Sequence, residues 1–378
     1  MRPCRHFSLL IRTAFLIALT AFTAIAADDG FLQVTGPCRL SFPADHGPHT
    51  DYRTEWWYYT GNVTDGDNRR FGFQLTFFRS GLQPPDKRRQ WPDPASTWRT
   101  DQIYLAHAAI SDIGGGRHLQ AERMARPVLS LAGADQVGGM VTIHVLDWQA
   151  AISPEAHRLQ ASTDAFSLTL DLAPDKPAVM HGDIGYSRKG QSPERASCYY
   201  SFTRLQASGT LSVDGTSHEV RGSAWMDHEF STAPLQPGIT GWDWFSLQLS
   251  DRTEIMIFLL RHGDGTLNPA SGGTIVTPSG RTRTLLRDDV RIEPSSHWTS
   301  PHSGARYPVE WQVAVVPLGL ELIVRANLDD QEMRTPNSTN VVYWEGSVQA
   351  KGTRNETAID GVGYVELTGY AQPFDAPM

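Results

Sequence analysis

Short runs of aromatic and β-branched residues alternate with turns rich in Gly, Asp, Asn and Pro along most of this chain. The first two runs, residues 51–62 and 71–79, flank the turn Thr64-Asp65-Gly66-Asp67, and this arrangement predicts a β-hairpin. No stretch of the sequence shows sustained helical periodicity. Many short strands with regular turns are typical of a sandwich or barrel, so we expect an all-β fold.

The strand pattern continues to the C-terminus with one marked interruption. Residues 231–240 contain two prolines and a glycine and separate two β halves of unequal size. We therefore expect an N-terminal β domain over residues 27–233 and a C-terminal β domain over residues 234–378, which the chain length also suggests. The later expected strands are residues 103–112, 141–146, 166–172, 199–203, 210–213, 223–229, 244–249, 254–260, 273–277, 309–315, 320–325, 341–349 and 363–368.

Residues 1–26 differ from the rest of the chain. Three arginines precede a short apolar run over residues 14–22, and the small-x-small pattern Ala24-Ile25-Ala26 follows it. This combination predicts a secretory signal peptide that is cleaved after Ala26, and hence a periplasmic or secreted protein. The apolar run is too short to span a bilayer and no second one appears, so we expect no transmembrane segment after cleavage.

Charge and cysteine content narrow the classes of partner. Acidic side chains number 41 against 33 basic ones, three of which lie in the predicted signal peptide. An acidic chain without a long basic run is a poor candidate for binding nucleic acid or anionic membranes. Only Cys38 and Cys198 remain after cleavage; they can form one disulfide in an oxidising compartment, and their spacing is not that of metal ligands. We expect no metal and no cofactor, because the sequence has neither a supporting ligand spacing nor a phosphate-cradling Gly loop.

The most unusual stretch is Gly222 to Phe230, where Asp227, His228 and Glu229 stand in a row among aromatic residues. Charged groups are costly to bury, so this arrangement indicates either a hydrogen-bonded structural carboxylate or an acid or base in an apolar pocket. In a strand, His228 would share one face with Met226 and Phe230, while Asp227 and Glu229 would share the other face with Trp225. Asp227 and His228 can then face one pocket only if a bulge or a strand end intervenes.

Carboxylates beside aromatic residues recur in three other stretches: Glu55-Trp56-Trp57-Tyr58-Tyr59, Trp242-Asp243-Trp244 and Tyr343-Trp344-Glu345-Gly346. Alternation places Glu55, Trp57 and Tyr59 on one face of a strand. A core strand whose Glu55 pairs with an arginine near the barrel end would explain the first stretch without any function. Taken together, the four stretches suggest one or two aromatic-lined cavities suited to a hydrophobic ligand with a few fixed polar groups.

The chain resembles a family of secreted lipocalin-like proteins related to carotenoid 1,2-hydratase (hydroxyneurosporene synthase), also described as attacin-immunity-like (AttH-like) or as predicted secreted hydrolases. The resemblance covers nearly all of the chain after the signal peptide and implies two lipocalin-like antiparallel β-barrel domains, one from each half. The stretches that carry it are residues 54–62, 71–79, 104–109, 199–205, 222–230, 241–249, 343–346 and 363–370.

Two classes of function follow. The first is a cofactor-independent hydratase, lyase or hydrolase acting on a lipid-like or isoprenoid-like molecule. In that reading the expected catalytic residues are Asp227 as the acid, His228 as its partner or water-orienting base, and Asp243 as an alternative acid. Tryptophan faces would stabilise a carbocation. The expected ligand-binding residues are Glu55, Trp57, Tyr59, His107, Trp225, Glu229, Trp242, Trp244, Tyr343 and Glu345.

The second class is a non-catalytic carrier of a lipid, or an accessory protein of an envelope export system. A carrier needs an open cavity, whereas an enzyme needs carboxylates that converge on a closed apolar pocket beside a second polar group. Convergence of the acids is therefore the feature of the tertiary structure that separates the two classes.

Overall fold

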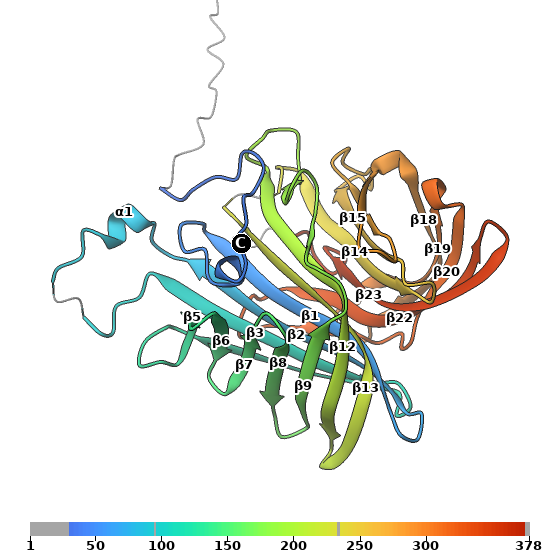
Figure 1. Ribbon diagram of the computed structural model, residues 1–378, viewed down its shortest axis with the longest axis horizontal. Coiled ribbons are helices and arrows are strands. Elements are labelled where there is room, and N and C mark those ends of the chain that lie inside the picture. Colours follow the sequence, from blue (N-terminus) through green and yellow to red (C-terminus); the bar gives the residue numbers. More distant parts are fainter. Residues whose placement is uncertain (1–29, 94–95, 233–234, 375–378) are drawn as a thin grey trace, which may run out of the picture.

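A computed structural model describes residues 30–93, 96–232 and 235–374 of the chain (Figure 1). The predicted signal peptide, residues 1–26, lies outside the described residues, as do residues 233 and 234 at the expected domain boundary. In the described part, the fold is all-β and consists of two curled antiparallel sheets, one nearly closed into a barrel and the other a half-barrel. The all-β prediction with two lipocalin-like barrels is confirmed at this level.

The first sheet contains 13 strands among the described residues, with β4-β3-β2-β1-β13-β12-β9-β8-β7-β6-β5 as its order and β10 and β11 paired to β12. Its strands are β1 (Thr54–Asp65), β2 (Arg70–Gly81), β3 (Gln102–Asp112), β4 (Arg117–Ala125), β5 (Ala132–Val137), β6 (Met140–Val145), β7 (Trp148–Ile152), β8 (His157–Ser162), β9 (Phe166–Pro174), β10 (Val179–Met180), β11 (Tyr186–Arg188), β12 (Ala196–Val213) and β13 (Thr216–Ser231).

The second sheet has ten strands in the described part, with the order β17-β16-β15-β14-β23-β22-β20-β19-β18 and β21 paired to β22. Its strands are β14 (Ile239–Leu249), β15 (Glu254–His262), β16 (Gly272–Val276), β17 (Thr282–Leu286), β18 (Val290–Thr299), β19 (Arg306–Val315), β20 (Leu320–Ala326), β21 (Glu332–Arg334), β22 (Val342–Arg354) and β23 (Thr357–Thr368).

Helical structure in the described residues is limited to short turns: α1 (Pro85–Arg88) in the loop after β2, and the 3-10 turns η1 (Ala44–His46), η2 (Arg287–Asp289) and η3 (Val316–Leu318). No helix in the described ranges has the length and apolar character needed to cross a membrane. One expectation about strands is wrong. Residues 199–203 and 210–213 were expected as two strands, but both belong to β12, whose pairing with β13 shifts at an irregularity between Phe202 and Leu205.

The three largest apolar clusters among the described residues follow from the alternation of side chains along these strands. The concave face of the first sheet buries residues such as Trp57, Phe73 and Met226, and that of the second sheet buries residues such as Phe245 and Trp311. The third core lies between the two sheets, where β1 and β13 of the first meet β14 and β23 of the second (Figure 1). Its buried apolar members are Tyr58, Tyr199, Trp225, Trp244, Met256 and Tyr364.

Residues 30–53, the segment that precedes β1 and is called the entry segment below, pack against the first sheet and are covalently linked to it. Cys38 forms a disulfide with Cys198 of β12, 160 residues away in the sequence. Within the same segment, His46 is buried and hydrogen-bonds Tyr200, while His49 stacks on Phe230 with ring centroids 3.6 Å apart. The entry segment therefore carries polar side chains into the first sheet's concave side.

Candidate functional site

Strand β13 separates the residues that the sequence places side by side. Met226 belongs to the core inside the first sheet, whereas Trp225 belongs to the core between the sheets. His228 follows Met226 inward and Asp227 follows Trp225 outward, because no irregularity interrupts the pairing of β13 with β1 at these residues. Asp227 and His228 therefore face two different sites and do not act as one catalytic pair.

Asp243, the alternative acid, lies in a third place, away from both Asp227 and His228. Its carboxylate pairs with Arg261, with 2.9 Å between Oδ1 and Nε, and accepts hydrogen bonds from the Tyr370 hydroxyl. Asp243 alternates with Trp242 and Trp244 along β14 and points to the inner side of the second sheet, where Tyr370 packs against the core.

The side chain of Asp227 lies between the sheets and is fully enclosed by hydrogen-bond donors. Its oxygens accept hydrogen bonds from the Tyr199 hydroxyl at 2.8 Å, the Trp225 indole N–H at 2.6 Å and the Ser201 hydroxyl. Burial raises the pKa of Asp227 to about 7, against the opposing effect of these three donors. This carboxyl group thus holds a proton in part of the molecules near neutral pH.

Polar partners surround Asp227 on both sides along the interface. His181 hydrogen-bonds Ser201 at 2.6 Å and Thr274 of the second sheet at 2.9 Å. Glu229 lies 3.3 Å from the ammonium group of Lys189, which also sits over the rings of Tyr199 and Phe258. Glu229 is thus held as half of an ion pair, whereas the three hydrogen-bond donors around Asp227 are all neutral.

A second pair of acids faces the same interface from the other sheet. Glu345 of β22 and Glu366 of β23 are direct cross-strand partners. Burial, followed by the charge of Glu366, raises the pKa of Glu345 well above its usual range, and burial raises the pKa of Glu366 to about 7. Because two adjacent buried carboxylates repel each other, at least one of them keeps its proton.

Aromatic side chains and unpartnered oxygen atoms complete this interface. The indole N–H of Trp242 donates to Glu366 at 3.2 Å, and Trp244 donates to the Tyr199 hydroxyl at the same distance. Glu345 Oε1 and the hydroxyl groups of Tyr58 and Tyr364 are buried without a hydrogen-bond partner. Buried polar atoms are nearly always satisfied, so these three oxygens mark a place that a water molecule or a polar group of a ligand can occupy.

His107 of β3 reaches this region from the first sheet. Its Nδ1 lies 2.9 Å from the Tyr343 hydroxyl and its Nε2 lies 2.9 Å from the Ser338 hydroxyl. Burial lowers the pKa of His107 to about 3, so its ring is neutral. Seven of the expected ligand-binding residues therefore lie between the sheets: His107, Trp225, Glu229, Trp242, Trp244, Tyr343 and Glu345. His107 is three strands away from Asp227 in the first sheet, because β2 and β1 separate β3 from β13.

Glu55, Trp57 and Tyr59 do not belong to that interface and lie inside the first sheet. Glu55 is buried and pairs with Arg79, with 2.8 Å between Oε2 and Nε. Its Oε1 is 2.8 Å from both His228 Nε2 and His49 Nδ1. Burial would raise the pKa of Glu55, but the charge of Arg79 and the two histidine hydrogen bonds lower it well below its usual range. This is the ion pair with an arginine that a purely structural role predicts.

His49, Glu55 and His228 also form the cluster in the described ranges that has the residue types of a metal site. Each histidine is held at its second ring nitrogen, His49 by Asp45 at 3.0 Å and His228 by the Tyr200 hydroxyl at 3.0 Å. However, both histidine nitrogens converge on a single oxygen of Glu55, and Arg79 occupies the other oxygen. The geometry fits a hydrogen-bonded ionic network better than ligands arranged around a cation.

Trp57 and Tyr59 have structural surroundings as well. The Trp57 ring stacks on His228 with centroids 4.7 Å apart, and its N–H donates to the backbone carbonyl of His46. The Tyr59 hydroxyl is 3.1 Å from Nδ1 of His157, which is also buried. These residues thus fill the barrel interior.

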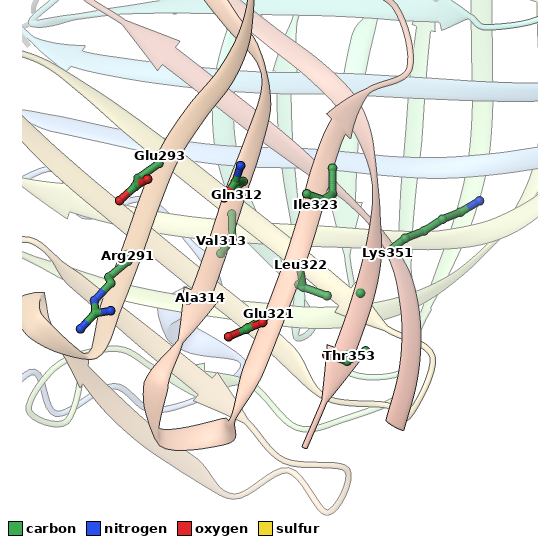
Figure 2. A pocket seen from close by; sticks show the side chains of 11 residues that line it. Arg291, Glu293, Gln312, Val313, Ala314, Glu321, Leu322, Ile323, Lys351 and Thr353 are labelled. Atoms are coloured by element: carbon green, nitrogen blue, oxygen red, sulfur yellow. The ribbon is translucent and has the colours of Figure 1, made fainter. Parts of the chain in front are cut away.

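A surface hollow of about 440 Å³ lies elsewhere, on β18, β19, β20 and β22 of the second sheet (Figure 2). Exposed side chains such as Glu321 and Lys351 line it, and none of the expected site residues does. It lacks the enclosed acids and aromatic walls of the interface between the sheets.

Sequence reasoning missed several residues of the interface, above all Tyr58, Tyr199 and Glu366. A signal for Glu366 exists, because it is one more carboxylate beside an aromatic residue, in Gly363-Tyr364-Val365-Glu366. Tyr58 lies in the recognised aromatic stretch on the face opposite Glu55. That this opposite face is buried could not be seen without the second sheet.

Comparison with known proteins agrees with this architecture. The AttH-like family model matches residues 33–370, and a search of curated proteins found no match. A crystal structure of a Nitrosomonas europaea protein classed with AttH is 34% identical, with a TM-score of 0.79 over 90% of this chain and 100% of that one. Kievitone hydratase from Nectria haematococca shares the fold at 14% identity, with a TM-score of 0.66 over 91% of this chain and 97% of that one.

A third structure, CghA with Sch210972, has 13% identity and a TM-score of 0.53, and covers 90% of this chain and 96% of that one. At such identities the last two show a shared fold only. The family model covers most of the chain, and the 34% identical structure is matched over its whole length. The chain therefore belongs to the AttH-like family.

Proposed function

We propose that this protein is a cofactor-independent hydro-lyase that acts on an apolar, unsaturated molecule between its two sheets. The observation that carries the proposal is the convergence of Asp227, Glu345 and Glu366 on one buried, aromatic-walled interface. The charge of Asp227 contributes to the raised pKa of Glu366, and the charges of all three acids contribute to the raised pKa of Tyr58. The groups therefore share one electrostatic environment. A carrier would not require acids to be gathered in this way.

The chemistry that these residues support is acid-catalysed hydration. Asp227, in its neutral form, donates its proton to one carbon of a double bond, and the π electrons form the new C–H bond. The adjacent carbon becomes a cation, which the faces of Trp244 and Tyr58 stabilise. Water then adds to that carbon and releases a proton to the Asp227 carboxylate, which restores the acid. Dehydration is the same sequence in reverse.

Substrate entry requires rearrangement of side chains. The rings of Tyr58 and Trp225 lie 5.3 and 6.2 Å from that of Trp244, centroid to centroid, so aromatic groups fill the region. A ligand must displace part of this packing, while the unpartnered oxygens of Tyr58, Tyr364 and Glu345 offer hydrogen bonds to its polar end. We therefore expect tryptophan fluorescence to change when a ligand binds.

The name of one structural neighbour, a hydratase, supports the reaction class, although 14% identity conveys only the fold. The proposed place of action is the periplasm or the exterior of the cell. The N-terminal pattern of residues 1–26 supports this, and so does the Cys38–Cys198 disulfide, because disulfides persist in oxidising compartments.

The test begins with untargeted mass spectrometry of apolar compounds that co-purify with the protein. Those compounds are then incubated with fresh protein in heavy-oxygen water, and the products are examined for one added, labelled water molecule. We expect labelled product with the wild type and none with Asp227→Asn. Asp171→Asn, on the exposed side of β9, is the matched control and should keep activity.

The outcomes separate the classes of function. A bound compound that is recovered with unchanged mass identifies a carrier and overturns the enzymatic proposal. Loss of activity in Asp227→Asn supports the proposal only if the variant keeps its melting temperature. Asparagine replaces one carboxylate oxygen with an NH₂ group, which cannot accept the hydrogen bonds that Tyr199, Ser201 and Trp225 donate to Asp227. His228→Gln should leave turnover unchanged, because that ring lies inside the first sheet.

A further inference from the structure

A chain of hydrogen bonds runs from the surface to the Tyr343 hydroxyl, which lies next to the buried acid Glu345 on β22. Glu122, a partly exposed residue of β4, accepts a hydrogen bond from the Ser338 hydroxyl. Ser338 lies 2.9 Å from Nε2 of His107, and Nδ1 of the same ring lies 2.9 Å from the Tyr343 hydroxyl. Tyr343 and Glu345 stand two residues apart on the same face of β22, and their side chains interact.

The direction of each hydrogen bond can be assigned from the surface inward. Glu122 accepts from Ser338 and from two N–H groups of Asn337, as an ionised carboxylate does. Ser338 has a single proton and donates it to Glu122, so Nε2–H of His107 must donate to Ser338. The neutral ring then has a bare Nδ1, which accepts the proton of Tyr343. Tyr343 has no second proton, so Glu345 must be the donor between the two.

A hydrogen bond from Glu345 to Tyr343 therefore requires Glu345 to be a neutral carboxylic acid. It agrees with the position of Glu345 directly opposite Glu366, where two charges would repel. From Tyr343 outward, each group thus donates in the same direction, toward Glu122, and a neutral Glu345 extends this chain inward. Such a chain can pass a proton along its length because each group both gives and receives one.

We propose that Glu122, Ser338, His107 and Tyr343 form a proton relay between solvent and the buried acid Glu345. Its use in catalysis rests on the proposed function, since an acid in a water-excluded site must exchange protons with solvent. His107 and Ser338 are relay residues and do not touch the substrate. Their two elements lie 231 positions apart in the sequence, so the relay exists only where the sheets meet.

The transfer balances proton by proton. When Glu345 is ionised, the hydrogen bonds point inward and Glu122 carries the proton taken from solvent. Glu122 gives it to Ser338, whose own proton moves to Nε2 of His107. The proton on Nδ1 moves to Tyr343, and the Tyr343 proton moves to Glu345. His107 changes from the Nδ1–H to the Nε2–H tautomer, no group keeps an extra proton, and the arrangement becomes the observed one.

The buried acid of the first sheet is connected differently. Asp227 leads through Ser201 to His181 and then to Thr274, which is itself buried. Among the hydrogen bonds of the described residues, the chain through His107 leads from a partly exposed carboxylate to Tyr343, the neighbour of Glu345 on the same face of β22. This difference provides an internal comparison for the test.

The experiment measures how fast the acid proton of Glu345 exchanges with solvent, in the free protein and without substrate. Rapid mixing into D₂O shifts the carboxylic acid C=O band in the infrared, and the Glu345→Gln variant identifies which band belongs to Glu345. We expect His107→Phe and Ser338→Ala to slow this exchange by at least about tenfold, the effect of a barrier raised by about 1.4 kcal/mol. Ser338→Thr restores the hydroxyl group and should restore the rate.

His157→Phe is the matched control, because His157 is also buried and neutral but lies inside the first sheet, outside the relay. In His157→Phe, the acid proton of Glu345 should exchange with solvent at the wild-type rate. Ser338 lies in a partly exposed loop, so Ser338→Ala keeps the test valid even if His107→Phe does not fold. Wild-type exchange in folded Ser338→Ala would overturn the relay. No substrate enters this measurement, so its result is independent of the test of hydration.

Discussion

Buried glutamates in this protein exist in two different charge states. Glu55 and Glu345 are both almost fully buried. Arg79 and two histidines surround Glu55 and keep it ionised, whereas Glu345 faces Glu366 and tyrosine hydroxyl groups and keeps its proton. The same residue type therefore stabilises the barrel interior as an anion and serves the interface as a neutral acid.

Replacing each glutamate by glutamine separates these two states. Glu55→Gln leaves the buried Arg79 without its counter-charge, so we expect the free energy of unfolding to fall by about 3–5 kcal/mol. Glu345→Gln exchanges one neutral group for another of similar shape and should cost less than about 1.5 kcal/mol. Urea denaturation at neutral pH measures both values. Equal losses in the two variants would contradict the assigned charge states.

His49 makes stability depend on pH in a defined window. Burial lowers the pKa of His49, but hydrogen bonds to Asp45 and Glu55 outweigh this and raise the pKa from 6.5 to about 9. A histidine whose pKa is higher in the folded state stabilises the fold fully below pH 6.5 and loses this effect as the pH rises through about 9. The loss should be on the order of 2–3 kcal/mol.

Denaturation of the wild type and of His49→Gln at several pH values between pH 6 and pH 10 checks this. His49→Gln should be less stable at the lower end, and the difference from the wild type should shrink as the pH rises. His144→Gln is the control, since the His144 ring hydrogen-bonds the backbone carbonyl of Ser130 and pairs with no carboxylate among the described residues. A difference that stays constant with pH would show that His49 is not charged in the folded protein.

At the scale of elements, β13 and the entry segment shape the two sides of the first sheet. Strand β13 contributes His228 to the inner network and Asp227 to the interface, so one strand supports both. The entry segment covers the inner network, because His46 and His49 contact Tyr200, Glu55 and Phe230. The Cys38–Cys198 disulfide holds this segment in place.

Removal of that disulfide should loosen the entry segment and lower stability. The bond closes a loop of 160 residues, and loss of a native disulfide costs about 2–5 kcal/mol. We expect the Cys38→Ser/Cys198→Ser protein to melt at a lower temperature than the oxidised wild type. Reductant should lower the melting temperature of the wild type and leave that of the double variant unchanged. Identical melting curves for both proteins would argue against a stabilising role.

At the scale of the whole molecule, the two sheets depend on each other. The core between them contains buried aromatic side chains, and buried ion pairs cross from one half to the other. Glu254 of the second sheet lies 2.6 Å from Nζ of Lys176, in the loop after β9, and 2.6 Å from Nε of Arg204 in β12. Neither half presents this face to water in the intact protein. The acids of the proposed active site also come from both sheets, so each half alone is incomplete.

We therefore expect the halves to stay together after the chain is cut. A protease site inserted among residues 233–240 allows cleavage of the folded protein, and size-exclusion chromatography should show both fragments in one peak. Glu254→Gln leaves Lys176 and Arg204 buried without their counter-charge, so the cut variant should dissociate more readily. Separation of the wild-type fragments would contradict this prediction, because it would mean that the interface between the sheets cannot hold the halves together without the connecting chain.

Local pattern was sufficient for several conclusions. Alternation along single strands predicted the all-β fold, the common face of Glu55, Trp57 and Tyr59, and the opposite faces of Asp227 and His228. The clustering of carboxylates with aromatic residues singled out some of the interface residues, among them Trp225, Trp244 and Glu345. These properties depend on near neighbours in the chain, because a strand repeats its side-chain direction every two residues whatever it pairs with.

Other features were decided by contacts between distant parts of the chain. Which face of β13 meets a barrel interior and which meets the other sheet depends on how both sheets curl and pack. The meeting of Glu345 with Glu366 depends on the register of β22 and β23, and that of His107 with Ser338 on the docking of the two sheets. Burial, and with it the protonation of each acid, follows from this packing, because only the surrounding atoms determine how far a charge is removed from water.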